Sequence, residues 1–170
     1  MKIRQIEFKE ENVIYDFIKK AFETAEVSDG TEQDFVLQLR SGKNYIPELE
    51  LIAEENGELI GHILFTKQKV IIKEKEIQAL LLAPLSVKLE WRSQGVGGKL
   101  IQEGFKRAKK LGYEVVFLIG NPKYYQRFGF CQTTKFGIKN DSDIPDLYVL
   151  GCALVPHVLD NVTGSIHIEG

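Results

Sequence analysis

The residues best suited to chemistry lie in a glycine-rich stretch that leads into an amphipathic helix. Arg92-Ser93-Gln94-Gly95-Val96-Gly97-Gly98 has three glycines in four positions, so its backbone can turn tightly and bring N–H groups close to a ligand. The N-terminal end of a helix adds free N–H groups and a partial positive charge. We therefore predict an anion site here, most simply for phosphate. A glycine-rich helix entry without a ligand is the alternative.

Two common phosphate motifs do not fit this stretch. A Walker loop, G-x-x-x-x-G-K-S/T, would need a glycine where Ser93 stands and a serine or threonine where Leu100 stands. The dinucleotide fingerprint G-x-G-x-x-G matches at Gly95 and Gly97 and then fails at Leu100. The pattern that remains is R-x-x-G-x-G.

This pattern resembles the pyrophosphate-binding signature of the GNAT superfamily of acyl-CoA N-acyltransferases. Leu85-Ser86-Val87 precedes it as a predicted strand, and Asn121 to Phe130 (NPKYYQRFGF) follows where that family carries its second signature. The resemblance covers most of the chain and is strongest from Ala79 to Phe130. It implies acetyl-CoA as cofactor, with the backbone near Leu85 and Val87 pairing with pantetheine. The cofactor-binding residues that it implies are Leu85, Val87, Arg92, Ser93, Gln94, Gly95, Val96, Gly97, Gly98, Lys99, Asn121 and Tyr124.

Acyl transfer to an amine needs a deprotonated amine and a proton for the departing thiolate. Tyr125 matches the position where many family members place a tyrosine that protonates the sulfur or orients the thioester, so we predict Tyr125 as the general acid. Packing over the cofactor channel is the alternative role, and Tyr124 the alternative residue. Asn121 is also placed to cap a helix that begins at Pro122.

The general base is open between water and His62. Many relatives use a glutamate on the strand before the glycine turn, whereas Ile77 to Val87 has only Gln78 and Ser86 as polar side chains. A water-mediated route is therefore the default. Histidine suits proton transfer near neutral pH, but a lone histidine in an apolar strand is more often structural.

The resemblance predicts an N-acetyltransferase that acts on a primary amine of a small molecule or peptide, by direct attack in a ternary complex. Glu23, Glu26, Asp29 and Asp34 lie in and beside the predicted loop Glu23 to Thr31 and hint at a cationic amine. A non-catalytic acyl-CoA binding or sensing domain is the alternative. The amine and the acyl chain length stay open.

The elements that must position these residues follow from hydrophobic periodicity. We predict strands over residues 2–8, 49–55, 58–72, 77–87 and 114–120, and helices over 10–24, 32–39, 97–111 and 122–128. Asn56-Gly57 predicts a hairpin, and Pro84 indicates an edge or a bulge. Further strands are expected at 147–154 and 165–168. The fold class is thus mixed α/β: a GNAT-like, twisted, mostly antiparallel sheet with one splayed parallel strand pair and about four helices, in a single domain of residues 1–170.

Composition bounds the partners. The formal charge of −2, from 22 basic and 24 acidic residues, gives no electrostatic footprint for nucleic acid or an anionic membrane, and this disfavours aminoacyl-tRNA acetylation. Cys131 and Cys152 lack metal-ligand spacing, so we expect reduced thiols and no metal. We expect a cytoplasmic protein, because no signal peptide or membrane span is evident. Dimers are common among GNAT relatives, so a homodimer is the assembly to test.

Overall fold

A computed structural model describes residues 1–25 and 28–169 of the chain. The chain divides into two compact units, Met1–Thr66 with Ala83–Arg107, and Lys67–Leu82 with Ala108–Gly170. The strands are β1 (Lys2–Gln5), β2 (Tyr45–Glu55), β3 (Glu58–Ile72), β4 (Lys75–Val87), β5 (Val115–Ile119), β6 (Cys131–Gln132), β7 (Ile138–Asn140), β8 (Val149–Ala153) and β9 (Gly164–Ile166). The α-helices are α1 (Glu11–Glu23), α2 (Glu32–Arg40), α3 (Val96–Lys110) and α4 (Pro122–Tyr125).

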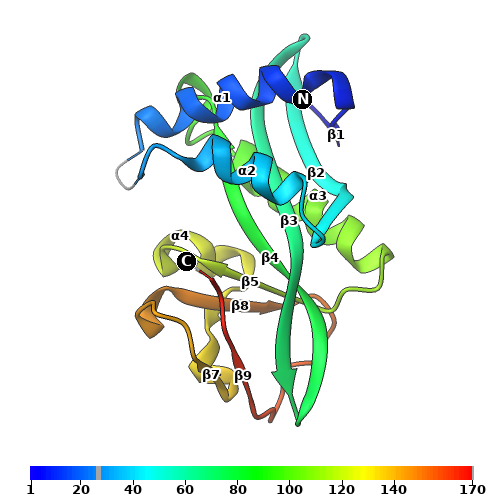
Figure 1. The fold of residues 1–170 in the computed structure, drawn as a ribbon, viewed down its shortest axis with the longest axis vertical. Coiled ribbons are helices and arrows are strands. Elements are labelled where there is room, and N and C mark those ends of the chain that lie inside the picture. Colours follow the sequence, from blue (N-terminus) through cyan, green and yellow to red (C-terminus); the bar gives the residue numbers. More distant parts are fainter. Residues whose placement is uncertain (26–27, 170) are drawn as a thin grey trace. The chain divides into compact units, whose positions relative to one another are not determined.

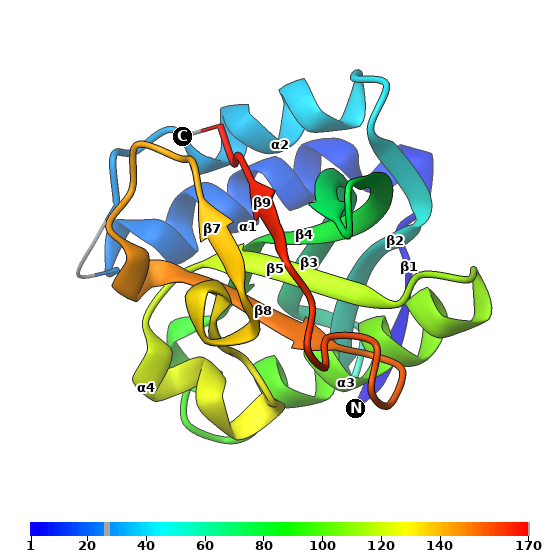
Figure 2. The ribbon, with the colours of Figure 1, turned by 90° about the horizontal axis from the view of Figure 1, so that it is seen from below.

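The first unit places helices on both faces of its strands. α1 and α2 lie together on one face of β2 and β3, and α3 lies on the other (Figures 1 and 2). A cluster of buried apolar side chains joins the first face to the two helices, and its members are Ile14, Ile18, Val36, Ile52 and Leu64. Burial of this kind contributes about 1.5–3 kcal/mol for each large aliphatic side chain. It therefore fixes the two helices on the sheet.

Two glycines let α3 approach the strands closely. A methyl group on Gly61 of β3 would come within 2.8 Å of Leu100 and 3.0 Å of Val96. One on Gly104 of α3 would come within 2.2 Å of the Phe65 ring. The first turn of α3 is therefore held against β3 by contacts that leave no space for an added side chain.

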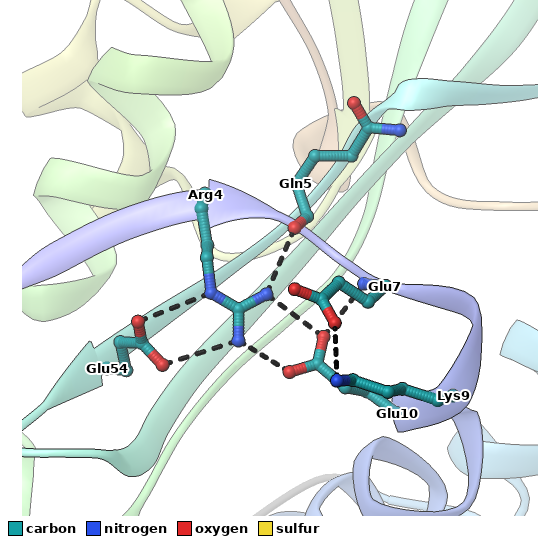
Figure 3. Close-up of polar contacts among 6 residues, drawn as sticks. All are labelled: Arg4, Gln5, Glu7, Lys9, Glu10 and Glu54. Atoms are coloured by element: carbon teal, nitrogen blue, oxygen red, sulfur yellow. Dashed lines mark hydrogen bonds and ion pairs between the residues drawn. The ribbon is translucent and has the colours of Figure 1, made fainter.

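Charged side chains join the N-terminal strand to its neighbours. Arg4 of β1 donates to both carboxylate oxygens of Glu54 on β2 and to both of Glu10, which closes the short 3₁₀ helix Phe8–Glu10 (Figure 3). These contacts lower the pKa of Glu10, chiefly through its hydrogen bonds with Arg4. The strand predicted over residues 2–8 consequently ends at Gln5, because the chain turns into this helix.

The second unit has a core of its own. β5 pairs with β8 in antiparallel register, β6 pairs with β8, and β9 lies between β3 and β7 (Figure 2). The buried residues that these strands enclose are Val70, Ile72, Ala79, Val115, Phe117, Ile138, Val149, Leu159, Val162, Ile166 and Ile168. Cys131 and Cys152 are both free thiols, and burial raises the pKa of Cys152 to about 11. At neutral pH, Cys152 is therefore a protonated thiol.

The sheet confirms the predicted class. Nine strands form one mixed sheet in the order β1-β2-β3-β4-β5-β8-β6, with β9 paired to β3 and β7. The predicted parallel pair is β4 with β5, joined at Leu80 to Val116 and at Leu81 to Phe117. Pro84 is not on an edge strand, since β4 stands between β3 and β5, and the pairing with β5 ends before it. A second parallel pair, β7 with β9, was not predicted.

Candidate active site

The backbone of the glycine turn passes twice through the left-handed region. Ser93 and Gly95 have φ values of +62° and +87°, in the left-handed region that costs a residue with a side chain about 1–2 kcal/mol. α3 begins at Val96, and its first backbone hydrogen bond runs from the Lys99 amide to the Gly95 carbonyl at 3.1 Å. The amides of Val96, Gly97 and Gly98 precede that bond. They therefore carry the partial positive charge of the helix end.

The side chain of Arg92 is committed to backbone carbonyls. Its Nη2 donates to the carbonyl of Ala21, near the C-terminal end of α1, at 2.6 Å, and its Nε donates to the carbonyl of Val87 at 3.1 Å. The guanidinium thus ties α1 to the end of β4 and also opposes the negative end of the α1 dipole. Gln94 likewise donates its side-chain amide to the Glu90 carbonyl, at 2.9 Å. The side chains of Arg92 and Gln94 thus stabilise the turn through hydrogen bonds to backbone carbonyls.

The end of β4 leads directly into this turn. Leu85 and Val87 are half-buried, and Ser86 between them is buried. The Lys88 amide donates to the Ile60 carbonyl at 2.9 Å, and the Lys88 ammonium pairs with Glu58. Lys99 is exposed in the first turn of α3. The predicted residues from Leu85 to Lys99 therefore form one continuous stretch within the first unit.

The other predicted residues belong to the second unit. Asn121 caps α4, because its Oδ1 accepts the Lys123 amide at 2.9 Å. Tyr124 lies edge-on to Tyr125, with ring centroids 4.9 Å apart and an interplanar angle of 86°, and Arg127 stands over its ring at 5.0 Å. The capping role expected of Asn121 is confirmed. Its contact with a cofactor stays a prediction.

Tyr125 is held by aromatic and glycine neighbours. Its ring meets Phe130 at a centroid distance of 5.8 Å, and a methyl group on Gly120 would come within 2.7 Å of it. Burial, with a smaller contribution from Tyr124, raises the pKa of Tyr125 to about 12. The phenol therefore keeps its proton throughout the physiological range.

A buried charged cluster joins His62, the candidate base, to residues of β2 and to Arg40 at the end of α2. Glu50 of β2 and His62 of β3 are fully buried, with His62 Nε2 2.8 Å from Glu50 Oε2. Arg40 donates to both Glu50 oxygens at 3.0 and 2.6 Å, and the Tyr45 hydroxyl donates to Oε1 at 2.7 Å. Burial alone would raise the pKa of Glu50, but the hydrogen bonds from His62, Arg40 and Tyr45 outweigh it and lower the pKa to about 2. Glu50 is thus an ionised carboxylate with four donors.

The acidic residues of the first loop are not gathered in one place. Glu23 lines a cavity of about 340 Å³ together with Asp16, Lys20, Lys88 and Glu90. Asp29 accepts both the amide and the hydroxyl of Thr31, at 2.8 and 2.6 Å. Asp34 accepts the Tyr15 hydroxyl at 2.8 Å. Glu26 lies outside the described residues.

The family model "Acetyltransferase (GNAT) domain" matches residues 2–133, which hold β1 to β6 and the glycine turn. The chain belongs to the GNAT family of acetyltransferases. It is 36% identical over 108 residues to the uncharacterized N-acetyltransferase YjhQ of Escherichia coli K12, a match that covers 64% of this chain and 60% of YjhQ. The chain therefore spans less than two thirds of that relative. The match to YhbS of the same strain is 35% identical over 83 residues, 48% of each chain.

Solved structures agree with this GNAT assignment. The crystal structure of E. coli YhbS in complex with CoA superposes with a TM-score of 0.83 at 24% identity, over 99% of this chain and 89% of YhbS, which shows the fold. A GNAT acetyltransferase from Brucella melitensis in complex with acetyl-CoA superposes with a TM-score of 0.76 at 29% identity, over 99% and 96% of the two chains. Within the described GNAT chain, no helix is both long and apolar enough to span a membrane.

Proposed function

We propose that this protein transfers the acetyl group of acetyl-CoA to a primary amine of a small molecule or peptide, by direct attack of the amine on the thioester. Membership of the GNAT family supports this, as do the N-acetyltransferase names of the relatives. Two neighbours crystallised with CoA or acetyl-CoA support the cofactor. The observation that carries the proposal is the glycine turn, which presents the first amides of a 15-residue helix behind two left-handed residues.

In this proposal the amides of Val96, Gly97 and Gly98 bind the pyrophosphate of the cofactor. An anion at a helix N-terminus gains from N–H donors and from the dipole together. The close contacts of Gly61 with Val96 and Leu100 keep that end of the helix in place. Backbone of Leu85 and Val87 would then pair with pantetheine, as the family resemblance implies.

Tyr125 serves the departing thiolate in the proposed reaction. Full proton transfer from a phenol with a pKa of about 12 to a thiolate with a thiol pKa of about 8.5 would be uphill by roughly 5 kcal/mol. We therefore assign Tyr125 a hydrogen bond to the sulfur as negative charge develops on it. Such a bond to a charged group contributes about 1.5–3 kcal/mol.

Thermal unfolding with and without acetyl-CoA tests the cofactor site. At 100 times its dissociation constant a ligand stabilises by about 2.7 kcal/mol, or roughly 5–11 °C for a chain of this size. Gly95→Glu should abolish the shift. Gly112→Glu is the matched control, because Gly112 has φ +93° and, like Gly95, nothing within 4 Å of an added methyl. Loss of the acetyl-CoA-dependent thermal shift in both variants, or in neither, would contradict the proposed cofactor site.

A turnover assay separates an enzyme from a binding domain. Release of free CoA thiol would be followed with spermidine, kanamycin, a lysine peptide and, as a neutral amine, aniline. We expect turnover with a cationic amine, since the three carboxylates of Asp16, Glu23 and Glu90 outnumber the two ammonium groups of Lys20 and Lys88 in one cavity. A cofactor-dependent thermal shift without turnover would favour the binding domain. Equal rates with aniline would remove the preference for cations.

The remaining sequence predictions belong to this proposal. We expect residues 1–170 to act as one acetyltransferase domain in the cytoplasm, without nucleic-acid or membrane partners. A homodimer is the assembly to test by sedimentation, and a monomer at assay concentration would remove it.

A further inference from the structure

The buried Glu50–His62 pair leaves one nitrogen of the histidine ring with no partner. Because Glu50 is ionised it can only accept hydrogen bonds, so His62 Nε2, at 2.8 Å, must carry the proton. In the neutral ring Nδ1 is then a bare lone pair. Nδ1 is fully buried and, among the described residues, has no hydrogen-bond partner.

A second unpaired polar atom lies on the facing strand. The hydrogen bond from the Lys88 amide to the Ile60 carbonyl sets the antiparallel register of β3 and β4, which places Ser86 opposite His62. Directly opposite residues point to the same face, with Cβ atoms about 4.5–5.5 Å apart. Ser86 is buried, and its Oγ also lacks a partner within the described chain.

Two unpaired polar atoms facing each other indicate a partner from outside the protein. Leaving a buried donor or acceptor unsatisfied is unfavourable, and the hydrogen-bond capacity of Glu50 is already taken by Arg40, Tyr45 and His62. Ser86 also lies between Leu85 and Val87, the residues proposed to pair with pantetheine. Ser86 Oγ therefore lies on β4, the strand where the thioester is proposed to bind, and His62 Nδ1 lies on the neighbouring strand β3.

We infer that His62 is the general base of the reaction, that Ser86 passes the proton to it, and that Glu50 is the positioning residue. This inference rests on the proposed function. The acceptor arrives as R–NH₃⁺. When the amine binds, the Ser86 hydroxyl turns to donate to His62 Nδ1, a hydrogen bond that is not formed among the described residues, and it takes one of the amine's protons as it gives its own to the ring. The freed lone pair forms the C–N bond as the C–S bond breaks, the second N–H proton leaves with the sulfur as CoA thiol, and His62 returns its proton to solvent.

The charges around His62 favour this cycle. Arg40 pairs with Glu50 and also lies near Glu11. The Glu11 carboxylate is 3.8 Å from Arg40 Nε. Two carboxylates and one guanidinium leave one negative charge, which the imidazolium of His62 would balance. Tyr45 adds no charge, because burial, with its hydrogen bond to Glu50, raises its pKa. Glu50 therefore fixes the ring tautomer and holds a negative charge beside the ring.

The pH dependence of kcat/KM, with the amine that wild type acetylates fastest, tests the base. We expect His62→Gln to lower kcat about 100-fold or more at pH 7, and the deficit to narrow as the pH approaches the pKa of the amine, where free amine needs no base. The KM for acetyl-CoA should not change. A deficit that is uniform with pH, or a folded variant with wild-type kcat, would overturn the inference.

Ser86→Ala keeps the test decisive if His62→Gln does not fold. Since Ser86 Oγ has no hydrogen-bond partner among the described residues, its removal should not lower stability, and we expect kcat to fall about tenfold. Unchanged kcat would overturn the relay. Glu50→Gln should lower kcat without changing KM. Arg4→Gln, which breaks a half-buried ion cluster in the same unit (Figure 3), is the control and should leave the pH profile unchanged.

Failure of this inference is distinguishable from failure of the proposed function. If acetyl-CoA gives no thermal shift, the cofactor proposal falls. If it gives a shift but no amine of the panel is acetylated, the general-base role is overturned while the cofactor site stands. If turnover is intact in Ser86→Ala and His62→Gln, the transferase stands with a different base.

Discussion

Arg92 offers the sharpest separation between a structural role and a cofactor-binding role. Its guanidinium donates to the carbonyls of Ala21 and Val87, at 2.6 and 3.1 Å. Hydrogen bonds from a charged donor contribute about 1.5–3 kcal/mol each, and the lower value applies because both bonds are only partly buried. Arg92→Gln should therefore lower the free energy of unfolding by about 3 kcal/mol. Arg92→Lys can keep one of the two bonds and should lose roughly half as much.

Urea denaturation and acetyl-CoA titration, each at two salt concentrations, would measure both roles. For a chain of this size, about 3 kcal/mol corresponds to a Tm lower by roughly 6–12 °C. We expect the Kd for acetyl-CoA, and its salt dependence, to stay within about threefold of wild type for folded Arg92→Gln, because the Arg92 guanidinium already donates to two backbone carbonyls. Arg4→Gln is the control for loss of a half-buried guanidinium, since Arg4 also pairs with partly exposed groups. Wild-type stability of Arg92→Gln combined with a tenfold or larger loss of affinity for acetyl-CoA would refute this reasoning. It would indicate that Arg92 binds the pyrophosphate.

Three further predictions follow from buried contacts. Gly104→Ala should lower stability by about 1–2 kcal/mol, because its methyl would come within 2.2 Å of the buried Phe65 ring and the overpacking outweighs the gain in helix propensity of about 1 kcal/mol. Adding Phe65→Leu should restore stability in the double variant. Unchanged stability in the single variant would contradict this packing. Glu50 has a pKa of about 2 in the folded protein against an ordinary value of 4.5, so its stabilisation is complete above pH 4.5 and is lost as the pH falls towards 2, about 3 kcal/mol in all. Urea unfolding of wild type should show this loss and Glu50→Gln should not. Tyr125→Phe should lower kcat roughly 10- to 100-fold in steady-state assays, whereas Tyr124→Phe should change it little; undiminished turnover in Tyr125→Phe would remove its role.

Much of the architecture was predictable because its signals are local. The run around Asn56-Gly57 gave a hairpin whose strands end at Glu55 and begin at Glu58, as predicted. The periodicity after Gly98 placed α3 to within one residue at each end. The glycine turn could be predicted for the same reason, because a position with φ +87°, that of Gly95, is usually occupied by glycine. Short strands gave no such signal: β6 has two residues and β7 three, too few for a period to appear.

The hydrogen-bond partners of side chains were less predictable than the helices and strands. Arg92 belongs to the R-x-x-G-x-G pattern, yet its partners Ala21 and Val87 are carbonyls, which every residue has and no motif records. Asn121 was expected both to cap α4 and to contact the cofactor; the structure shows the cap, and the contact stays a prediction. A polar residue in a motif can thus support the backbone that presents a site instead of touching the ligand.

The Glu50–His62 pair shows why the candidate base could not be assigned from sequence. A two-residue turn at Asn56-Gly57, continued without interruption, would set His62 opposite Leu51 and so on the other face from Glu50. The register instead shifts between Ala53 and Glu54, which brings His62 opposite Ile52 and onto the face of Glu50. Because side chains alternate with a period of two, one extra residue transfers every later side chain to the other face. That single irregularity, which no local pattern of apolar residues reveals, converts an isolated strand histidine into one held by a buried carboxylate.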